Sequence, residues 1–401
     1  MKHYTFLIIL LLTTFSTYSQ VDRLTKSLNA YSFDLYGQIK TDNENLFVSP
    51  LSTYYALLVA HEGAKNETKA EFEKVLHIDN SESLTNCKDF SENLISLRDS
   101  SNYLNISNAI WIQKDFSVIE DYKNQIIEKY SSDLKTVDFK QKISASNEIN
   151  NWVTNKTNGL IKDIICPKEI NTDTRLIILN TICFIGKWRD EFNKGLTNSD
   201  YFYSINKEKS DVDFMNKTEY LQYYENKDFQ FISKPYEGND KSFCILLPKS
   251  RYGLIDIENI FTNSTLDTIL HNTGYLEVKL SIPKFKLETT YSLKEPLIKL
   301  GLEKAFTRHA DFSGITSEVP LLINKVNHKA YIEINEEKTE AGAATIVEMM
   351  DGSTGGSMPK PKKFKADHPF TFMIVDNKTN GIIFIGRYVR AEEPFIAKEY
   401  K

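Results

Sequence analysis

Residues 336–349, EEKTEAGAATIVEM, and the stretch that follows them, 351–363, DGSTGGSMPKPKK, carry the most specific structural information in this chain. From Lys338 onward, every charge in the first stretch falls on one set of alternate positions, so the pattern predicts a strand with one buried face. The uncharged face holds Thr339, Ala341, Ala343, Thr345, Val347 and Met349. The second stretch is rich in Gly, Ser, Pro and Lys, which indicates an exposed loop. A strand-forming segment that leads into a loop suggests a piece of chain with two alternative positions, one in solvent and one within a sheet.

The composition is that of a protein with a large core. Of 401 residues, 41% are hydrophobic and 12% aromatic, and the formal net charge is -5. No block of Lys and Arg rises above this background, so nucleic acid is not an expected partner. Length alone permits one large domain or two to three ordinary ones.

The N-terminus has the pattern of a signal peptide over residues 1–19. Lys2 precedes the apolar run Phe6–Leu12, and the small polar stretch Thr13–Ser19 suits cleavage before Gln20. No later segment has the length of a membrane helix, so no membrane partner is expected. We expect a secreted protein, extracellular or periplasmic, in which residues 20–401 form a single domain.

The cysteine pattern does not indicate a metal site. Cys87, Cys166, Cys183 and Cys244 are widely spaced and form no CxxC pair, so zinc is not expected. Cys183 and Cys244 lie in apolar runs, LIILNTICFIG and SFCILLP, and we expect both as buried free thiols. A disulfide among the four remains an open alternative.

Local patterns predict an α+β fold, with helices dominant in the first half of the chain and strands in the second. Helices are expected over Val21–Lys40, Tyr54–His61, Ser117–Tyr130, Ala145–Thr154 and Leu293–Leu300. Strands are expected over Leu104–Ile112, Leu176–Ile185, Phe229–Lys234, Phe243–Pro248, Tyr275–Pro283 and Ala330–Asn335. Ser49-Pro50 provides a helix start, with the serine as cap. Phe370–Val375 and Ile382–Ile385 are expected as a hairpin buried on both faces.

The sequence contains no local catalytic motif. There is no HExxH, no GxSxG, no Walker loop and no GxGxxG. The histidines are scattered, and His77 and His271 suit solvated surface positions. We therefore expect a protein that is not an enzyme and needs no cofactor. A secreted hydrolase is the competing class, and labelling by a covalent serine-hydrolase probe would reveal it.

Four motifs, at suitable spacing over about Leu24–Val389, resemble the serpin family. They are Asn45-Leu-Phe-Val-Ser-Pro-Leu-Ser52 with Ala56-Leu-Leu and Gly63-Ala64, Asn180-Thr-Ile-Cys-Phe-Ile-Gly-Lys-Trp188 with Phe192, the run from His328 to Thr345, and Phe364-Lys-Ala-Asp-His-Pro-Phe370. The last motif departs at Thr371, where the family usually has an apolar residue. The resemblance implies helices packed on a large mixed central β-sheet, further β-sheets and an exposed reactive-centre loop over about residues 336–363. The plain signal peptide and the many Asn, Lys and Ile residues favour a bacterial-type member.

The resemblance also implies a mechanism. In serpins the exposed loop is offered to a protease, which forms an acyl-enzyme at the scissile bond, and the cleaved loop then inserts into the central sheet. The expected partner is a serine protease, with a cysteine protease as the alternative, and the chain is expected to be a monomer.

The hinge of the loop is where inhibitory and non-inhibitory serpins differ. The hinge corresponds to Glu336, Glu337, Lys338, Thr339, Glu340, Ala341, Gly342, Ala343 and Ala344. The short residues among them suit rapid insertion, as in inhibitory members. Lys338 stands where inhibitory relatives usually have Gly, and it supports the alternative of a non-inhibitory binding or carrier protein. Because Lys338 falls on the outward face, we expect it to slow insertion rather than prevent it.

The position of the scissile bond depends on the reference point. Counting forward from Glu336 with the family's usual spacing gives Gly352–Ser353, with Met350–Asp351 and Asp351–Gly352 as alternatives. Counting backward from Pro369 gives Met358–Pro359, which is disfavoured because Pro after the bond makes a poor protease substrate. A flexible tip without a fixed cleavage point is a further alternative.

The resemblance assigns two structural clusters. A buried polar cluster beneath the sheet opening, called the shutter, corresponds to Ser49, Ser52, Asn180 and His328. A cluster at the top of the sheet, called the breach, corresponds to Trp188, Lys284 and Glu336, with an expected Lys284–Glu336 salt bridge. The alternative for His328 is a core histidine with no role in opening. His368 is expected to be structural.

Overall fold

A computed structural model describes residues 23–79, 103–336 and 360–391. Residues 23–39 are helical, as predicted. The labelled helices are α2 (Pro50–Gly63), α3 (Asn66–Val75), α5 (Glu120–Tyr130), α6 (Lys142–Lys156), α7 (Leu254–Ile260), α8 (Asn263–Asn272) and α9 (Lys294–Leu300). The strands are β1 (Leu46–Val48), β2 (Tyr103–Gln113), β3 (Asp133–Val137), β4 (Leu176–Ile185), β5 (Asn198–Tyr203), β6 (Lys209–Glu225), β7 (Phe229–Pro235), β8 (Lys241–Pro248), β9 (Gly274–Pro283), β10 (Phe285–Ser292), β11 (Lys325–Ile334), β12 (Lys362–Lys365), β13 (Phe370–Asp376) and β14 (Ile382–Tyr388).

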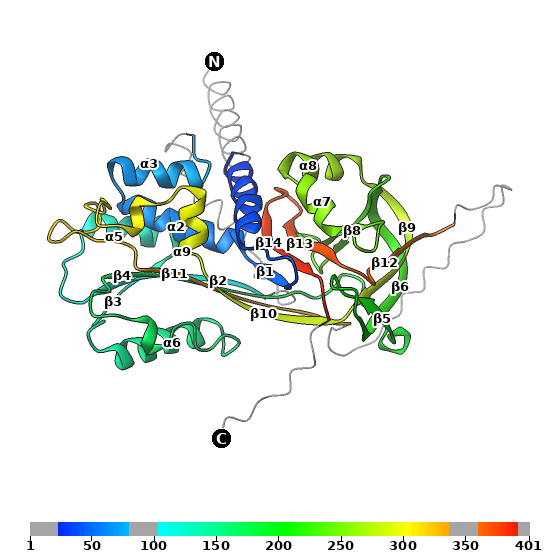
Figure 1. Cartoon of the computed structure of the whole chain (residues 1–401), viewed down its shortest axis with the longest axis horizontal. Coiled ribbons are helices and arrows are strands. Elements are labelled where there is room, and N and C mark those ends of the chain that lie inside the picture. Colours follow the sequence, from blue (N-terminus) through cyan, green and yellow to red (C-terminus); the bar gives the residue numbers. More distant parts are fainter. Residues whose placement is uncertain (1–22, 80–102, 337–359, 392–401) are drawn as a thin grey trace, which may run out of the picture.

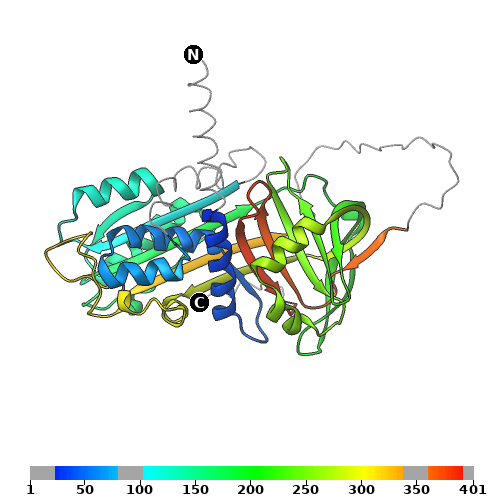
Figure 2. The same ribbon diagram turned by 90° about the horizontal axis from the view of Figure 1, so that it is seen from above.

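Within the described residues the strands form two sheets (Figure 1). A nine-stranded sheet has the order β1-β14-β13-β8-β7-β6-β9-β12, with β5 paired to β6. A five-stranded sheet has the order β10-β11-β4-β2-β3 and mixes parallel with antiparallel pairs. The nine-stranded sheet is also mixed, since β12 pairs parallel with β9, but helices cover both faces of the five-stranded sheet, which therefore corresponds to the expected central sheet (Figure 1). Seen from above, the nine-stranded sheet lies at one end of the long axis and α2, α3 and α5 at the other (Figure 2).

Helices cover both faces of the five-stranded sheet, which explains the continuous apolar run in β4. Figure 1 shows α6 on one side of this sheet and α2 with α5 on the other. Ile177 and Leu179 belong to the same buried cluster as Ile149 of α6, whereas Ile178 and Ile182 belong to the main core together with α2. A strand buried on both faces needs apolar residues at consecutive positions, not at alternate ones.

The capped helix and the C-terminal hairpin are confirmed. The Ser49 side chain accepts a hydrogen bond from the Ser52 N–H, and Pro50 begins α2. β13 and β14 pair antiparallel, and every residue of both strands is buried. Cys183 and Cys244 are buried free thiols, as expected, whereas Cys166 is free and exposed. Cys87 lies outside the described residues.

Several strands differ from the sequence-based expectation. β5, β6 and β10 are absent from it because their outward residues are polar or charged and the apolar signal is interrupted. β11 begins at Lys325 and not at Ala330. Its polar first half, KVNHK, pairs with β4 and β10, and its side chains find polar partners: Lys325 bonds Glu169, and Asn327 and Lys329 bond the carbonyls of Ile164 and Lys162.

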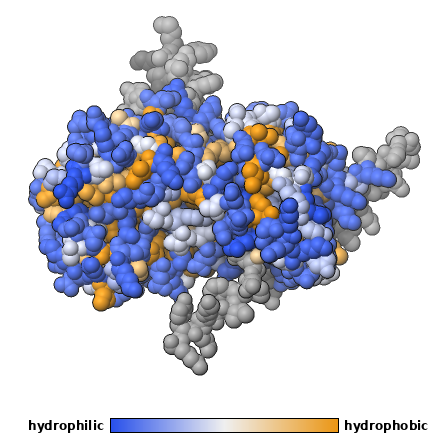
Figure 3. All heavy atoms as spheres, viewed as in Figure 1, coloured by the Kyte–Doolittle hydropathy of each residue, from blue (hydrophilic) through white to orange (hydrophobic). Residues whose placement is uncertain are grey.

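The surface agrees with the composition. The face shown in Figure 3 is mostly hydrophilic, consistent with the 26% of charged residues. His77 and His271 are exposed, as predicted, and the His77 ring lies 2.7 Å from an Asp34 carboxylate oxygen.

Candidate functional site

The candidate site is the junction between β4 and β11, two parallel neighbours in the five-stranded sheet. Residues 325–331 of β11 pair with residues 177–183 of β4, from Lys325↔Ile177 to Tyr331↔Cys183. The pairing ends there, although β11 continues to Ile334 and β4 to Ile185. The two strands therefore separate at this end, and the chain reaches Glu336 beside the point of separation.

A pocket at the point of separation has almost no free space. It is lined by Phe184, Gly186, Trp188, Tyr236, Ile332, Glu333, Ile334 and Asn335, and its volume is about 10 Å³. A cavity of this size holds about one water molecule. The strands must therefore move apart before a peptide can lie between them.

The breach residues come together as predicted. Lys284 Nζ lies 3.0 Å from Glu336 Oε2, and the Thr197 hydroxyl donates to Glu336 Oε1 at 2.7 Å. Burial alone would raise the pKa of Glu336, but the hydrogen bonds from Thr197, the backbone and Lys284 lower it overall. The Glu336 side chain is only 5% exposed, so its charge is held by specific partners. The predicted salt bridge is confirmed, and Thr197 is an addition that sequence reasoning missed.

Trp188, the third breach residue, contacts the chain directly after the end of β11. Its indole N–H donates to the Asn335 carbonyl at 2.9 Å, one residue before Glu336. The ring stacks on Tyr236 with centroids 4.8 Å apart and meets Phe243 edge-on at 5.8 Å. Trp188 is 3% exposed, so the whole contact lies within the core.

The shutter residues form one hydrogen-bonded chain across the β4–β11 junction. The Ser49 backbone N–H donates to His328 Nε2 at 3.1 Å, and His328 Nδ1 lies 2.7 Å from Asn180 Oδ1. Because Nε2 accepts a bond, the proton of the neutral imidazole is on Nδ1, which donates to Asn180. The Asn180 amide nitrogen faces the Ser52 carbonyl at 2.8 Å and the Ser52 hydroxyl at 2.5 Å. Every member of this chain is fully buried.

The shutter also reaches the second sheet and β2. The Ser49 hydroxyl donates to the Ile383 carbonyl of β14 at 2.7 Å. Asn108 of β2 accepts a hydrogen bond from the Asn180 amide nitrogen. Sequence reasoning missed Asn108, although a signal exists: Asn108 alternates with Ile106, Ile110 and other apolar residues on one face of a strand.

The environment of His328 keeps its ring neutral. Burial lowers the pKa of His328 to about 3. A protonated ring would also place an N–H opposite the N–H of Ser49. The arrangement therefore holds β4, β11 and the start of α2 together only while the ring is neutral.

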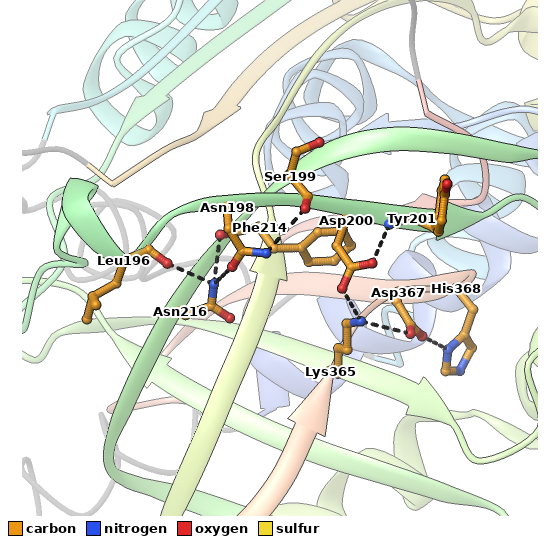
Figure 4. A network of polar contacts seen from close by, with 10 residues as sticks. All are labelled: Leu196, Asn198, Ser199, Asp200, Tyr201, Phe214, Asn216, Lys365, Asp367 and His368. Carbon is orange, nitrogen blue, oxygen red and sulfur yellow. Dashed lines mark hydrogen bonds and ion pairs between the residues drawn. The ribbon is translucent and has the colours of Figure 1, made fainter.

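Charged contacts hold β12, the strand that follows residues 337–359, to the nine-stranded sheet. β12 is an edge strand that pairs parallel with β9. In Figure 4, Lys365 reaches Asp200 of β5 at 2.7 Å and Asp367 at 3.5 Å. At the other end of β12, Lys362 lies 2.8 Å from Glu225 of β6. The described residues on either side of 337–359 therefore belong to different sheets.

His368 belongs to the same network. Its Nδ1 lies 2.8 Å from the Asp367 carboxylate and its Nε2 2.7 Å from the Pro248 carbonyl. These contacts join the start of β13 to the end of β8, which suits the structural role expected for it.

The remaining predicted residues lie outside the described part of the chain. They are the hinge positions Glu337, Lys338, Thr339, Glu340, Ala341, Gly342, Ala343 and Ala344, and the candidate bond positions Met350, Asp351, Gly352 and Ser353. In residues 23–79, 103–336 and 360–391, no group of His, Cys, Asp or Glu side chains could hold a metal ion. None of the helices described there is both long and apolar enough to cross a membrane.

Comparison with known proteins identifies the family. The family profile described as "Serpin (serine protease inhibitor)" matches residues 26–391. A serpin-like protein of Methanosarcina acetivorans is 39% identical over 90% of this chain and 86% of its own length. The leukocyte elastase inhibitor of Xenopus laevis is 33% identical over 92% of this chain and 99% of its own. The crystal structure of the thermophilic serpin tengpin in the native state superposes with a TM-score of 0.82, at 32% identity over 92% of this chain and 94% of that one. The chain belongs to the serpin family.

Proposed function

We propose that this serpin is a suicide-substrate inhibitor of a serine protease, with a cysteine protease as the alternative target. The observation that carries the proposal is the parallel junction between β4 and β11, which ends beside Glu336. A protease cleaves the reactive-centre loop between Gly352 and Ser353, or at one of the neighbouring bonds Met350–Asp351 and Asp351–Gly352. The part of the loop that stays attached to β11 then inserts between β4 and β11 while the acyl-enzyme persists.

The strand directions favour insertion. A segment that leaves β11 and turns back runs antiparallel to β11, and therefore also antiparallel to β4. Insertion would thus replace one parallel ladder by two antiparallel ladders, which are slightly more stable per residue. The uncharged face of the loop spans Thr339–Met349, a length close to the ten residues each of β4 and β11.

The energetics place strict demands on the inserted residues. Ordering the backbone costs about 1–2 kcal/mol per residue. The new hydrogen bonds return ~1 kcal/mol each, so these two contributions nearly cancel. Burial of the inward side chains then decides whether the free energy of insertion is favourable. An uncharged face at 339–349 therefore supports inhibition.

The test combines the purified protein with subtilisin, elastase and trypsin in separate reactions. Inhibition predicts a complex that survives denaturing electrophoresis, and the mass of the released C-terminal peptide identifies the scissile bond. Cleavage within 349–359 without a complex, and without a rise in thermal stability, would contradict insertion. The alternative of a non-inhibitory binding or carrier protein, for which Lys338 is the sequence support, would then replace the proposal.

We also propose that the protein is secreted and consists of one domain. Residues 1–19 act as a signal peptide, and residues 20–401 form one secreted, monomeric, non-enzymatic domain. A mature N-terminus at Gln20 in the intact mass of the exported protein would support this. The relatives described above are archaeal and vertebrate, so the bacterial source rests on the signal peptide and composition alone.

A further inference from the structure

Lys234 of β7 is a fully buried lysine that none of the clusters described above uses. Its side chain is 0% exposed, and its ammonium lies 2.5 Å from Glu219 Oε1 of β6. It also donates to the Asp190 carbonyl at 2.8 Å. One cation therefore connects β7 and β6 with the segment that follows β4.

The same ammonium faces two aromatic rings of that segment. It lies 4.9 Å from the centroid of Phe192 and 5.4 Å from that of Trp188. The two rings meet edge-on, with centroids 5.9 Å apart. Both distances are within the range of cation–π attraction. Lys234 thus contacts the segment 188–192 at three positions, and Trp188 is one of them.

Stability alone does not explain a charge at this place. Burial lowers the pKa of Lys234 to about 8, even though Glu219 opposes this effect. The second Glu219 oxygen, Oε2, is buried and has no hydrogen-bond partner among the described residues. A buried pair of this kind is often no more stabilising than two apolar side chains of similar volume, whereas its contacts restrict geometry strongly.

We propose that Lys234, with Glu219 as its counter-ion, is the positioning residue of Trp188 at the point where β4 and β11 separate. The ammonium fixes the indole so that its N–H stays directed at the Asn335 carbonyl, 2.9 Å away. The start of the hinge is thereby held beside the gap that the loop must enter. The consequence for inhibition rests on the function proposed above, whereas the positioning of the indole does not.

The decisive variant replaces both charges at once. Lys234→Met alone would leave Glu219 buried without its cation, so Lys234→Met with Glu219→Leu is used to keep the protein folded. The matched control is Lys241→Met with Asp376→Asn. Lys241 and Asp376 form another buried ion pair of the nine-stranded sheet, at 2.6 Å, and an Asn at 376 retains an acceptor for the turn that follows.

The first readout is the exchange of the Trp188 indole N–H with solvent, followed by NMR of the ¹⁵N-tryptophan-labelled full chain and assigned with Trp188→Phe. Positioning predicts exchange about tenfold faster in the Lys234/Glu219 variant. It predicts little change in this exchange rate in the Lys241/Asp376 control. The resonances of Trp111 and Trp152 should stay in place in both variants. An unchanged Trp188 resonance and exchange rate in the folded variant would overturn the proposal.

The second readout separates this proposal from the function on which it depends. With a protease that forms a complex, the variant should give about twofold more cleaved serpin per complex at an unchanged rate of loop cleavage. If the unmodified protein forms no complex with any protease, the proposed function fails and the indole measurement alone decides the role of Lys234. A third outcome is that complexes form while the variant changes neither the exchange rate of the Trp188 indole N–H nor the ratio of cleaved serpin to complex. In that case only the role proposed for Lys234 is wrong.

Discussion

Asn180 of β4 and His328 of β11 are register partners across the parallel junction, and their side chains are joined by a hydrogen bond of 2.7 Å. This bond lies near the middle of the paired stretch, which runs from Lys325 to Tyr331 on β11. An inserting strand has to break it. This hydrogen bond therefore joins the two strands at the centre of their paired stretch, and it depends on the protonation of one ring.

The first prediction concerns how protonation of His328 changes the stability of the folded protein. His328 has a pKa of about 3 in the folded protein, against an ordinary value of about 6.5. The unfolded chain therefore takes up a proton that the folded protein excludes. The contribution of the neutral His328 ring to the stability of the fold is present above pH 6.5 and is lost as the pH falls toward 3. We expect His328 to contribute a loss of about 1.4 kcal/mol per pH unit in the free energy of unfolding. Urea unfolding at pH 7.0 and pH 5.5 measures it.

The control for this experiment is a pair of histidine variants. His328→Asn should be less stable at neutral pH, because the Ser49 N–H loses its acceptor, and its stability should vary less between the two pH values. His271→Asn, at an exposed position of α8, should retain the full pH dependence of the unmodified protein. An equal pH dependence in all three proteins would show that His328 does not titrate as described.

A second prediction concerns Lys338, which the family resemblance assigns to the pivot of the loop. Lys338→Gly should increase the share of protease recovered as stable complex, because Gly permits backbone conformations that Lys disfavours. A difference of ~0.5–1 kcal/mol in the barrier to insertion corresponds to about a two- to fivefold change in the ratio of complex to cleaved serpin. Lys360→Gly, beyond the inserting segment, is the matched control. A ratio that is unchanged by Lys338→Gly would remove the only sequence feature that favours the non-inhibitory alternative.

The shutter and breach residues were predicted through the family resemblance, and Lys284 and Glu336 pair as expected. Ser49 and Asn180 also carry a local signal, since each is a polar residue within an apolar run, whereas His328 lies between Asn327 and Lys329. Asn108 carried the same signal and could have been found. Thr197 could not, because a threonine in a polar loop has no distinguishing pattern, and only the tertiary fold brings it to Glu336.

Strands made of consecutive apolar residues could be predicted from sequence. Strands whose polar residues are buried only because tertiary contacts supply hydrogen-bond partners could not. β4, β13 and β14 are apolar along their length and were located closely. The first half of β11 was missed because its lysines and asparagine become acceptable only when the carbonyls of Lys162 and Ile164 and the carboxylate of Glu169 approach them. Lys234 is the extreme case, since its strand was predicted but its burial was not.

A third prediction concerns β12, which the Lys362–Glu225 ion pair helps to hold at the sheet edge. Hydrogen bonds from Lys362 and Lys249 lower the pKa of Glu225 to about 2. The interaction is therefore complete above pH 4.5 and is lost as the pH falls toward 2. Glu225→Gln should reduce the protection of the backbone amides of residues 362–365 at pH 7, measured by hydrogen exchange. At pH 3 the Glu225 carboxylate of the folded protein is still mostly ionised, so the unmodified protein should keep more of this protection than the variant.

A matched control exists for this ion pair. Glu44→Gln removes a comparably charged but exposed pair, Glu44–Arg390, and should leave β12 unaffected. If Glu225→Gln and Glu44→Gln give the same protection of residues 362–365, then the Lys362–Glu225 pair does not help to hold β12, and its pairing with β9 and the contacts of Lys365 suffice.

The fourth prediction tests the two faces of the loop directly. Ala343 and Ala344 are neighbours with identical side chains, but the period of two places Ala343 on the uncharged face and Ala344 on the opposite one. Ala343→Glu would bury an unpaired carboxylate on insertion, at a cost of several kcal/mol, which exceeds the small net gain expected from the new ladders. We expect this variant to be cleaved as a plain substrate, without stable complex and without a rise in Tm after cleavage. Ala344→Glu should still form complex, because Ala344 lies on the face that already carries Lys338, Glu340 and Glu348. Gels and thermal unfolding of the two cleaved variants measure the difference, and equal behaviour would contradict insertion in this register.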